Sequence, residues 1–103
     1  MKYNLKKEIV TFSGEFVKDQ DGIQNALVSK IVINSLLAMF KDEADCSGED
    51  KLKRYAISES INSNPESVEL SNSDCVFIMK YVDKMGFAPL VYKHVHEVLE
   101  KKE

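Results

Sequence analysis

The chain has 103 residues and a net charge of −3, from 14 basic and 17 acidic side chains. A chain of this length fits one domain and buries about 65% of its unfolded surface on folding. The lack of a basic excess disfavours a protein that holds nucleic acid through its phosphates. A hydrophobic fraction of 44% beside a charged fraction of 30% disfavours disorder.

The first segment has the pattern of a β-hairpin. Residues 9–12 and 16–17 are β-branched or aromatic, which is typical of strands. Ser13 and Gly14 between them form a short polar step, and the glycine tolerates a positive φ. We therefore expect strands at 3–12 and 15–18, which form a hairpin over 3–18. Because an isolated hairpin is marginal in water, it must lie on helices or pair with another segment.

A central helix is predicted after the hairpin. Asp21 is a suitable N-cap for a helix over about 22–40. Apolar residues lie on most sides of that helix rather than on one stripe, so most of its surface should be buried.

Three further helices are marked by residues at their ends. Ser47 and Ser71 each stand three positions before an aspartate, the spacing of a capping box, and predict helices over about 48–62 and 72–85. Pro65 must follow the first of these, and Gly86 suits the position after the second. Pro89 fits the first turn of a last helix, over about 88–101. The sequence thus predicts an α+β fold, with an N-terminal β-hairpin followed by four helices.

No motif indicates catalysis, a metal or a cofactor. His94 and His96 lie about 200° apart on a helix and cannot share an ion there. Cys75 falls on an apolar stripe, and Cys46 precedes a helix N-terminus, where a thiol can be activated. The acidic residues 42–50 lack the glycine of a calcium loop and are explained by a solvated loop. We expect no enzyme, and the alternative is a small enzyme that uses Cys46 or His94.

Two groups of side chains are candidate contact surfaces. Lys51, Lys53 and Arg54 with Tyr55 could touch phosphate or a base, against the simpler alternative of a solvated helix face. A larger aromatic and apolar set exceeds what four short helices need, and it predicts a protein-binding surface unless the hairpin covers it. This set comprises Phe12, Phe16, Phe77, Tyr81, Phe87, Leu90 and Tyr92. An exposed strand edge beside it favours a homodimer.

Five segments of the chain carry a resemblance to viral proteins. These are the Ser13-Gly14 turn with Glu15–Asp19, then Val32–Ala38, Ser47–Tyr55, Val68–Asp74, and the last helix from Pro89 to Glu100. Together they resemble small proteins of about a hundred residues that tailed bacteriophages and prophages encode. The layout of a hairpin before helices is also similar to phage tail assembly chaperones. The resemblance implies an accessory role and supplies no catalytic residues.

We therefore expect a non-enzymatic, phage-encoded accessory that binds a protein, of the assembly-chaperone or adaptor type. The alternatives are an inhibitor of a host protein, such as a defence system or a polymerase, and a weak nucleic-acid-binding protein. Residues 1–8 are polar and lysine-rich and do not resemble a signal peptide. No apolar run is long enough to cross a membrane. We expect the cytoplasm of a bacterial host as the location.

Overall fold

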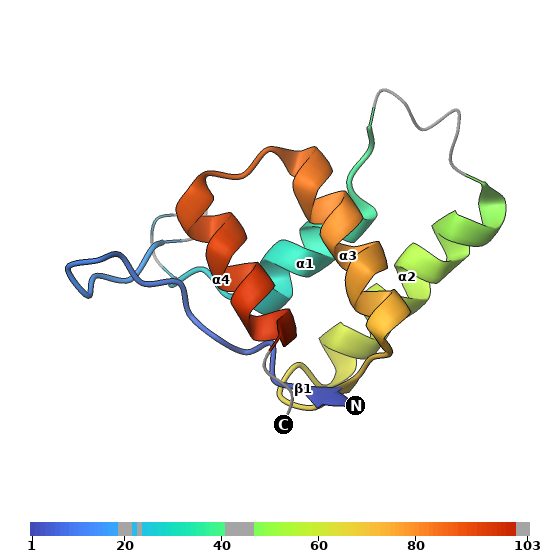
Figure 1. Cartoon of the computed structure of the whole chain (residues 1–103), viewed down its shortest axis with the longest axis horizontal. Helices are drawn as coiled ribbons and strands as arrows, with labels where there is room; N and C mark the ends of the chain where they lie inside the picture. Colours follow the sequence, from blue (N-terminus) through green and yellow to red (C-terminus); the bar gives the residue numbers. More distant parts are fainter. Residues whose placement is uncertain (19–21, 23, 41–46, 101–103) are drawn as a thin grey trace.

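The structure is a computed structural model that describes residues 1–18, 22, 24–40 and 47–100. An N-terminal hairpin is followed by four helices, which confirms the predicted α+β class (Figure 1). In chain order they are β1 (Lys2–Tyr3), α1 (Val28–Leu37), α2 (Gly48–Ser63), β2 (Val68–Glu69), α3 (Asn72–Met85) and α4 (Pro89–Glu100).

The N-terminal hairpin is present, and it reverses direction at Ser13-Gly14 as predicted. The Thr11 carbonyl accepts a hydrogen bond from the Gly14 N–H at 3.0 Å, and Gly14 has a φ of 85°. The arms then meet through a bridge between Val10 and Phe16. The pairing is much shorter than strands over 3–12 and 15–18 would give. We call residues 9–17 the N-terminal hairpin below.

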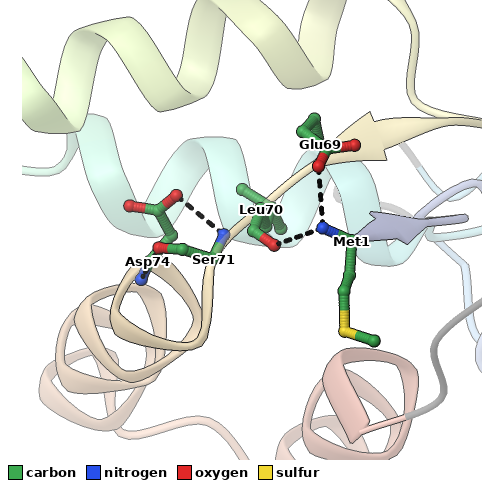
Figure 2. Close-up of polar contacts among 5 residues, drawn as sticks. All are labelled: Met1, Glu69, Leu70, Ser71 and Asp74. Atoms are coloured by element: carbon green, nitrogen blue, oxygen red, sulfur yellow. Dashed lines mark hydrogen bonds and ion pairs between the residues drawn. The ribbon is translucent and has the colours of Figure 1, made fainter.

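The start of the chain pairs with a distant segment, which the sequence did not predict. Tyr3 of β1 lies antiparallel to Val68 of β2, and Lys2 lies opposite Glu69. The Met1 ammonium also binds the Glu69 carboxylate at 2.7 Å (Figure 2). The segment that precedes α1 is therefore joined to a segment that follows α2.

The ends of the later helices agree with their sequence signals. The Ser71 hydroxyl accepts a hydrogen bond from the Asp74 N–H at 3.1 Å, and the Asp74 carboxylate accepts one from the Ser71 N–H at 3.0 Å, a complete capping box (Figure 2). The Ser47 hydroxyl likewise accepts from the Asp50 N–H. Gly86 ends α3 in the left-handed region. These helices match the predicted bounds closely, while residue 101 lies outside the described residues.

Helix α1 is shorter than the predicted helix over 22–40. Residues 25–27 are extended, because the Ala26 N–H donates to the Val17 carbonyl at 2.7 Å and Leu27 bridges to Glu8. Backbone hydrogen bonds to the hairpin thus replace the first turns of the expected helix. At the other end, Ala38 is extended. The proposed N-cap, Asp21, lies outside the described residues.

The core forms around α1, which contacts each of the other three helices. This arrangement agrees with the prediction that the first helix is the central one. Its buried Val28, Val32 and Leu36 lie at helical spacing on one face. The remaining core residues come from the N-terminal segment, from the extended segment ahead of α1, from β2 and its end, and from the other helices: Tyr3, Leu5, Ile9, Ala26, Ile57, Ile61, Val68, Leu70, Ile78, Tyr81, Val82, Val95 and Leu99. No helix within the described residues is long and apolar enough to cross a membrane.

Candidate functional site

A groove lies between the N-terminal hairpin and the start of α4. The hairpin contributes Val10, Thr11 and Phe12, and α4 contributes Pro89, Leu90, Lys93 and His94. We call these residues the hairpin–α4 groove. Its volume is about 630 Å³, within the range of about 300–1,000 Å³ that is usual for ligand sites. Its walls are mainly apolar, and Lys93 and His94 supply its charged or titratable groups.

His94 fixes the position of the hairpin on α4. The Val10 N–H donates a hydrogen bond to Nε2 of His94 at 3.3 Å, and Nδ1 lies 2.8 Å from the Leu90 carbonyl oxygen. Because a carbonyl oxygen can only accept, Nδ1 carries the proton and Nε2 is the acceptor, which defines a neutral tautomer. Both ring nitrogens therefore bind backbone groups, and the hydrogen bond to Val10 connects the hairpin wall of the groove to its α4 wall.

The hairpin presents two aromatic side chains to the surroundings. Phe12 is fully exposed, at 104% of its reference area, and Phe16 is 50% exposed. A phenylalanine ring in water has an unfavourable hydration free energy that a partner's surface would relieve. Both residues are among the predicted partner contacts. Phe12 lines the groove, and Phe16 lies opposite Val10, another lining residue, on the second arm of the hairpin.

The other aromatic candidates do not form a single surface with these two. Tyr81 is only 2% exposed and packs in the core, so it is not available to a partner. Its ring lies against Phe77, with centroids 5.1 Å apart, and against Phe40 at 6.0 Å. Phe77, Phe87, Leu90 and Tyr92 are partly buried against the core. Of the predicted surface, only Leu90 lines the groove together with Phe12.

The basic candidates are also divided, because Arg54 is buried. Arg54 is 4% exposed and donates hydrogen bonds to the carbonyls of Leu36 and Ala38, both at 2.6 Å. Its guanidinium carbon lies 4.4 Å from the centroid of the Tyr81 ring. Arg54 therefore satisfies carbonyls at the end of α1 and cannot reach a nucleic acid.

The remaining basic candidates lie at the surface of α2. Lys53 contacts the Asp74 carboxylate at 3.7 Å and lies over the Phe77 ring. Lys51 and Tyr55 are exposed. Because Arg54 is buried, the side chains predicted as nucleic-acid contacts present less positive charge at the surface than the sequence suggested.

A second apolar surface, which the sequence did not predict, lies at the end of α1. Leu37, Ala38 and Met39 line a hollow of about 200 Å³ with Lys51 and Tyr55 of α2. Met39 is 92% exposed and Tyr55 is 60% exposed. One feature of the sequence could have indicated this surface: residues 27–40 contain more apolar side chains than a single buried face can hold.

The candidate catalytic and metal-binding residues do not assemble into a site. His96 lies on the exposed side of α4, 3.4 Å from Glu100 and stacked on Tyr92. Within the described ranges, no three His, Cys, Asp or Glu side chains lie close enough to hold a metal ion. Cys46 and the acidic residues 42–45 lie outside those ranges. Cys75 hydrogen-bonds the Tyr3 hydroxyl, and this bond, together with burial, raises the pKa of Tyr3.

Comparison with models of protein families, with curated proteins and with solved structures found no match to the chain.

Proposed function

We propose that this chain is a non-catalytic, phage-encoded accessory protein that binds another protein through the N-terminal hairpin and the adjoining groove. The observation that carries the proposal is the exposure of Phe12 and Phe16 beside the hairpin–α4 groove. Together they offer a projecting aromatic pair and an apolar hollow at one end of the molecule. Such contiguous apolar surface, rimmed by charged groups, is typical of sites for protein partners.

The chemistry of the groove favours binding over catalysis. A general base needs a nitrogen or oxygen within reach of a substrate proton, and both nitrogens of His94 are already within hydrogen-bonding distance of backbone groups. The Lys93 ammonium lies 3.5 Å from the Glu97 carboxylate on the outer side of α4. The further N–H donors of Lys93 can orient a bound peptide through one of its carboxylates, while His94 holds the apolar wall in place.

Within this class, an adaptor or assembly-chaperone role in the cytoplasm of an infected bacterium is the function we propose. Such a protein holds an apolar segment of a partner until assembly, which requires a reversible apolar contact rather than a reaction. A nucleic-acid role is less well supported, since Arg54 is buried and the chain is acidic overall.

The test is affinity capture by the full chain from a lysate of phage-infected bacteria, with three baits. We expect the unchanged chain to retain one partner and Phe12→Ala/Phe16→Ala to lose it. The matched control is Leu52→Ala/Val76→Ala, which removes side chains that are 74% and 73% exposed on α2 and α3 and should leave capture unchanged.

The identity of the captured protein separates the possible roles. A phage structural protein supports the assembly role, and a host enzyme or defence protein would replace it with inhibition. Capture that the hairpin variant leaves intact, or no capture by any bait, contradicts the proposal.

A further inference from the structure

We infer that the hairpin–α4 groove receives the hairpin tip of a second copy of this chain, so that two copies form a reversible dimer by exchanging Phe12. The inference rests on the proposed function, because both use the same surface, and it names one occupant for that surface.

The walls and the charge of the groove define the ligand that it would recognise. Its apolar walls suit a bulky side chain. The Lys93 ammonium at its edge lies 3.5 Å from Glu97 of the same helix and has further N–H donors for a carboxylate of the ligand. The best ligand is therefore a tight turn that carries an aromatic residue beside an acid. The hairpin tip of this chain has that composition, since Phe12 and Phe16 are exposed and Glu15 lies exposed between them.

A two-fold arrangement would fill the grooves of both copies at once. Phe12 lines the same groove that we expect it to enter on the other copy, so the projecting residue and the hollow lie at one end of the molecule. Under a two-fold axis each copy gives one tip and receives one tip, and the interface closes after two copies. Glu15 of each copy would then meet Lys93 of the other, so that the charges are complementary across the axis.

The area that the tips would bury sets the expected strength of the dimer. The Phe12 ring and the exposed half of Phe16 together present about 300 Å² on each tip, so two tips and the surfaces that receive them would bury about 1,200 Å² in total. This value is at the lower limit for specific protein interfaces, about 1,200–2,000 Å². We therefore expect a dimer that dissociates on dilution, and its tips would also be available to another protein.

The experiment is sedimentation equilibrium of the full chain over a wide range of concentrations. We expect the average mass to rise from one copy to two, and Phe12→Ala to raise the dissociation constant at least tenfold. Because the Phe12 ring is fully exposed, this variant should fold normally, which circular dichroism checks. Leu52→Ala is the control and should leave the dissociation constant unchanged.

A charge exchange tests the pairing itself. Glu15→Lys or Lys93→Glu alone should weaken the dimer several-fold, and both together should restore it, which a merely structural role of either residue would not produce. A mass of one copy at every concentration overturns the inference, as does a dimer that Phe12→Ala leaves intact. If a monomeric chain still captures another protein through Phe12, the inference is wrong while the proposed function stands.

Discussion

The guanidinium of Arg54 lies over the ring of Tyr81, with its central carbon 4.4 Å from the ring centroid, and joins three helices at one point. Arg54 belongs to α2 and Tyr81 to α3, while its hydrogen bonds go to Leu36 and Ala38 at the end of α1. A helix end leaves carbonyls without partners, and here a side chain from another helix supplies the missing donors. The cation also stacks on the face of the tyrosine ring, so the carbonyls and the ring both stabilise the buried charge.

Replacing Arg54 by Met should destabilise the fold by about 2–4 kcal/mol, because two carbonyls lose their donors in a buried place. Urea denaturation followed by circular dichroism measures this change. Arg54→Lys should recover only part of the loss, since an ammonium cannot reproduce the planar fork. Lys51→Met on the exposed side of α2 is the control, and equal losses in Arg54→Met and Lys51→Met would contradict this role.

Removing the His94 side chain should loosen the hairpin without unfolding the helices. His94→Ala leaves the Val10 N–H without its acceptor, so we expect faster hydrogen exchange at the Val10 amide, and a global loss of about 1–2 kcal/mol. Amide exchange followed by NMR gives the rate at that position. His96→Ala, an exposed neighbour on the same helix, should leave it unchanged. A Val10 amide that exchanges equally slowly in both variants would refute the anchoring role.

Tyr3 should make the fold sensitive to alkaline pH. A hydrogen bond with Cys75 and burial raise the pKa of Tyr3 above its usual 10.0, so the folded chain holds this proton more tightly than the unfolded chain. The resulting stability is complete below pH 10 and is lost progressively as the pH rises beyond it. Urea midpoints measured from neutral to alkaline pH should fall less steeply for Tyr3→Phe. Tyr55→Phe, at an exposed site, should follow the unchanged chain, and parallel curves for all three proteins would exclude the effect.

Glu69 should contribute stability that is lost in acid. The Met1 ammonium hydrogen-bonds the Glu69 carboxylate and attracts its charge, which lowers the pKa of Glu69 below its usual 4.5. The folded chain therefore releases this proton more readily, and the gain is present above pH 4.5 and disappears as the pH falls through the lowered pKa. NMR titration of the Glu69 side chain reads its pKa directly. Acetylation of the amino group should return that pKa towards its usual value, and a pKa indifferent to acetylation would show that the ion pair does not form in solution.

The ends of the helices after residue 47 follow from local signals in the sequence. The N-cap at Ser47, the capping box at Ser71, the glycine at 86 and the prolines at 65 and 89 act on backbone groups within a few residues of themselves, so no distant contact is needed to fix those ends. The reversal at Ser13-Gly14 is local for the same reason. For the candidate site, Phe12 and Phe16 are among the partner contacts predicted from the sequence, and both lie exposed on the hairpin.

Where segments distant in the chain meet depends on tertiary contacts. The pairing of Tyr3 with Val68 and the extended residues 25–27 ahead of α1 depend on hydrogen bonds between remote backbone groups. The contact of His94 with Val10 depends on a hydrogen bond from a remote backbone N–H to the imidazole ring. On α2 the buried residues are Arg54, Ile57, Ser58 and Ile61, whereas Leu52 and Tyr55 are exposed. The Arg54 guanidinium is buried where carbonyls accept its N–H groups and an aromatic ring covers it, and that environment exists only once α1, α2 and α3 have packed together.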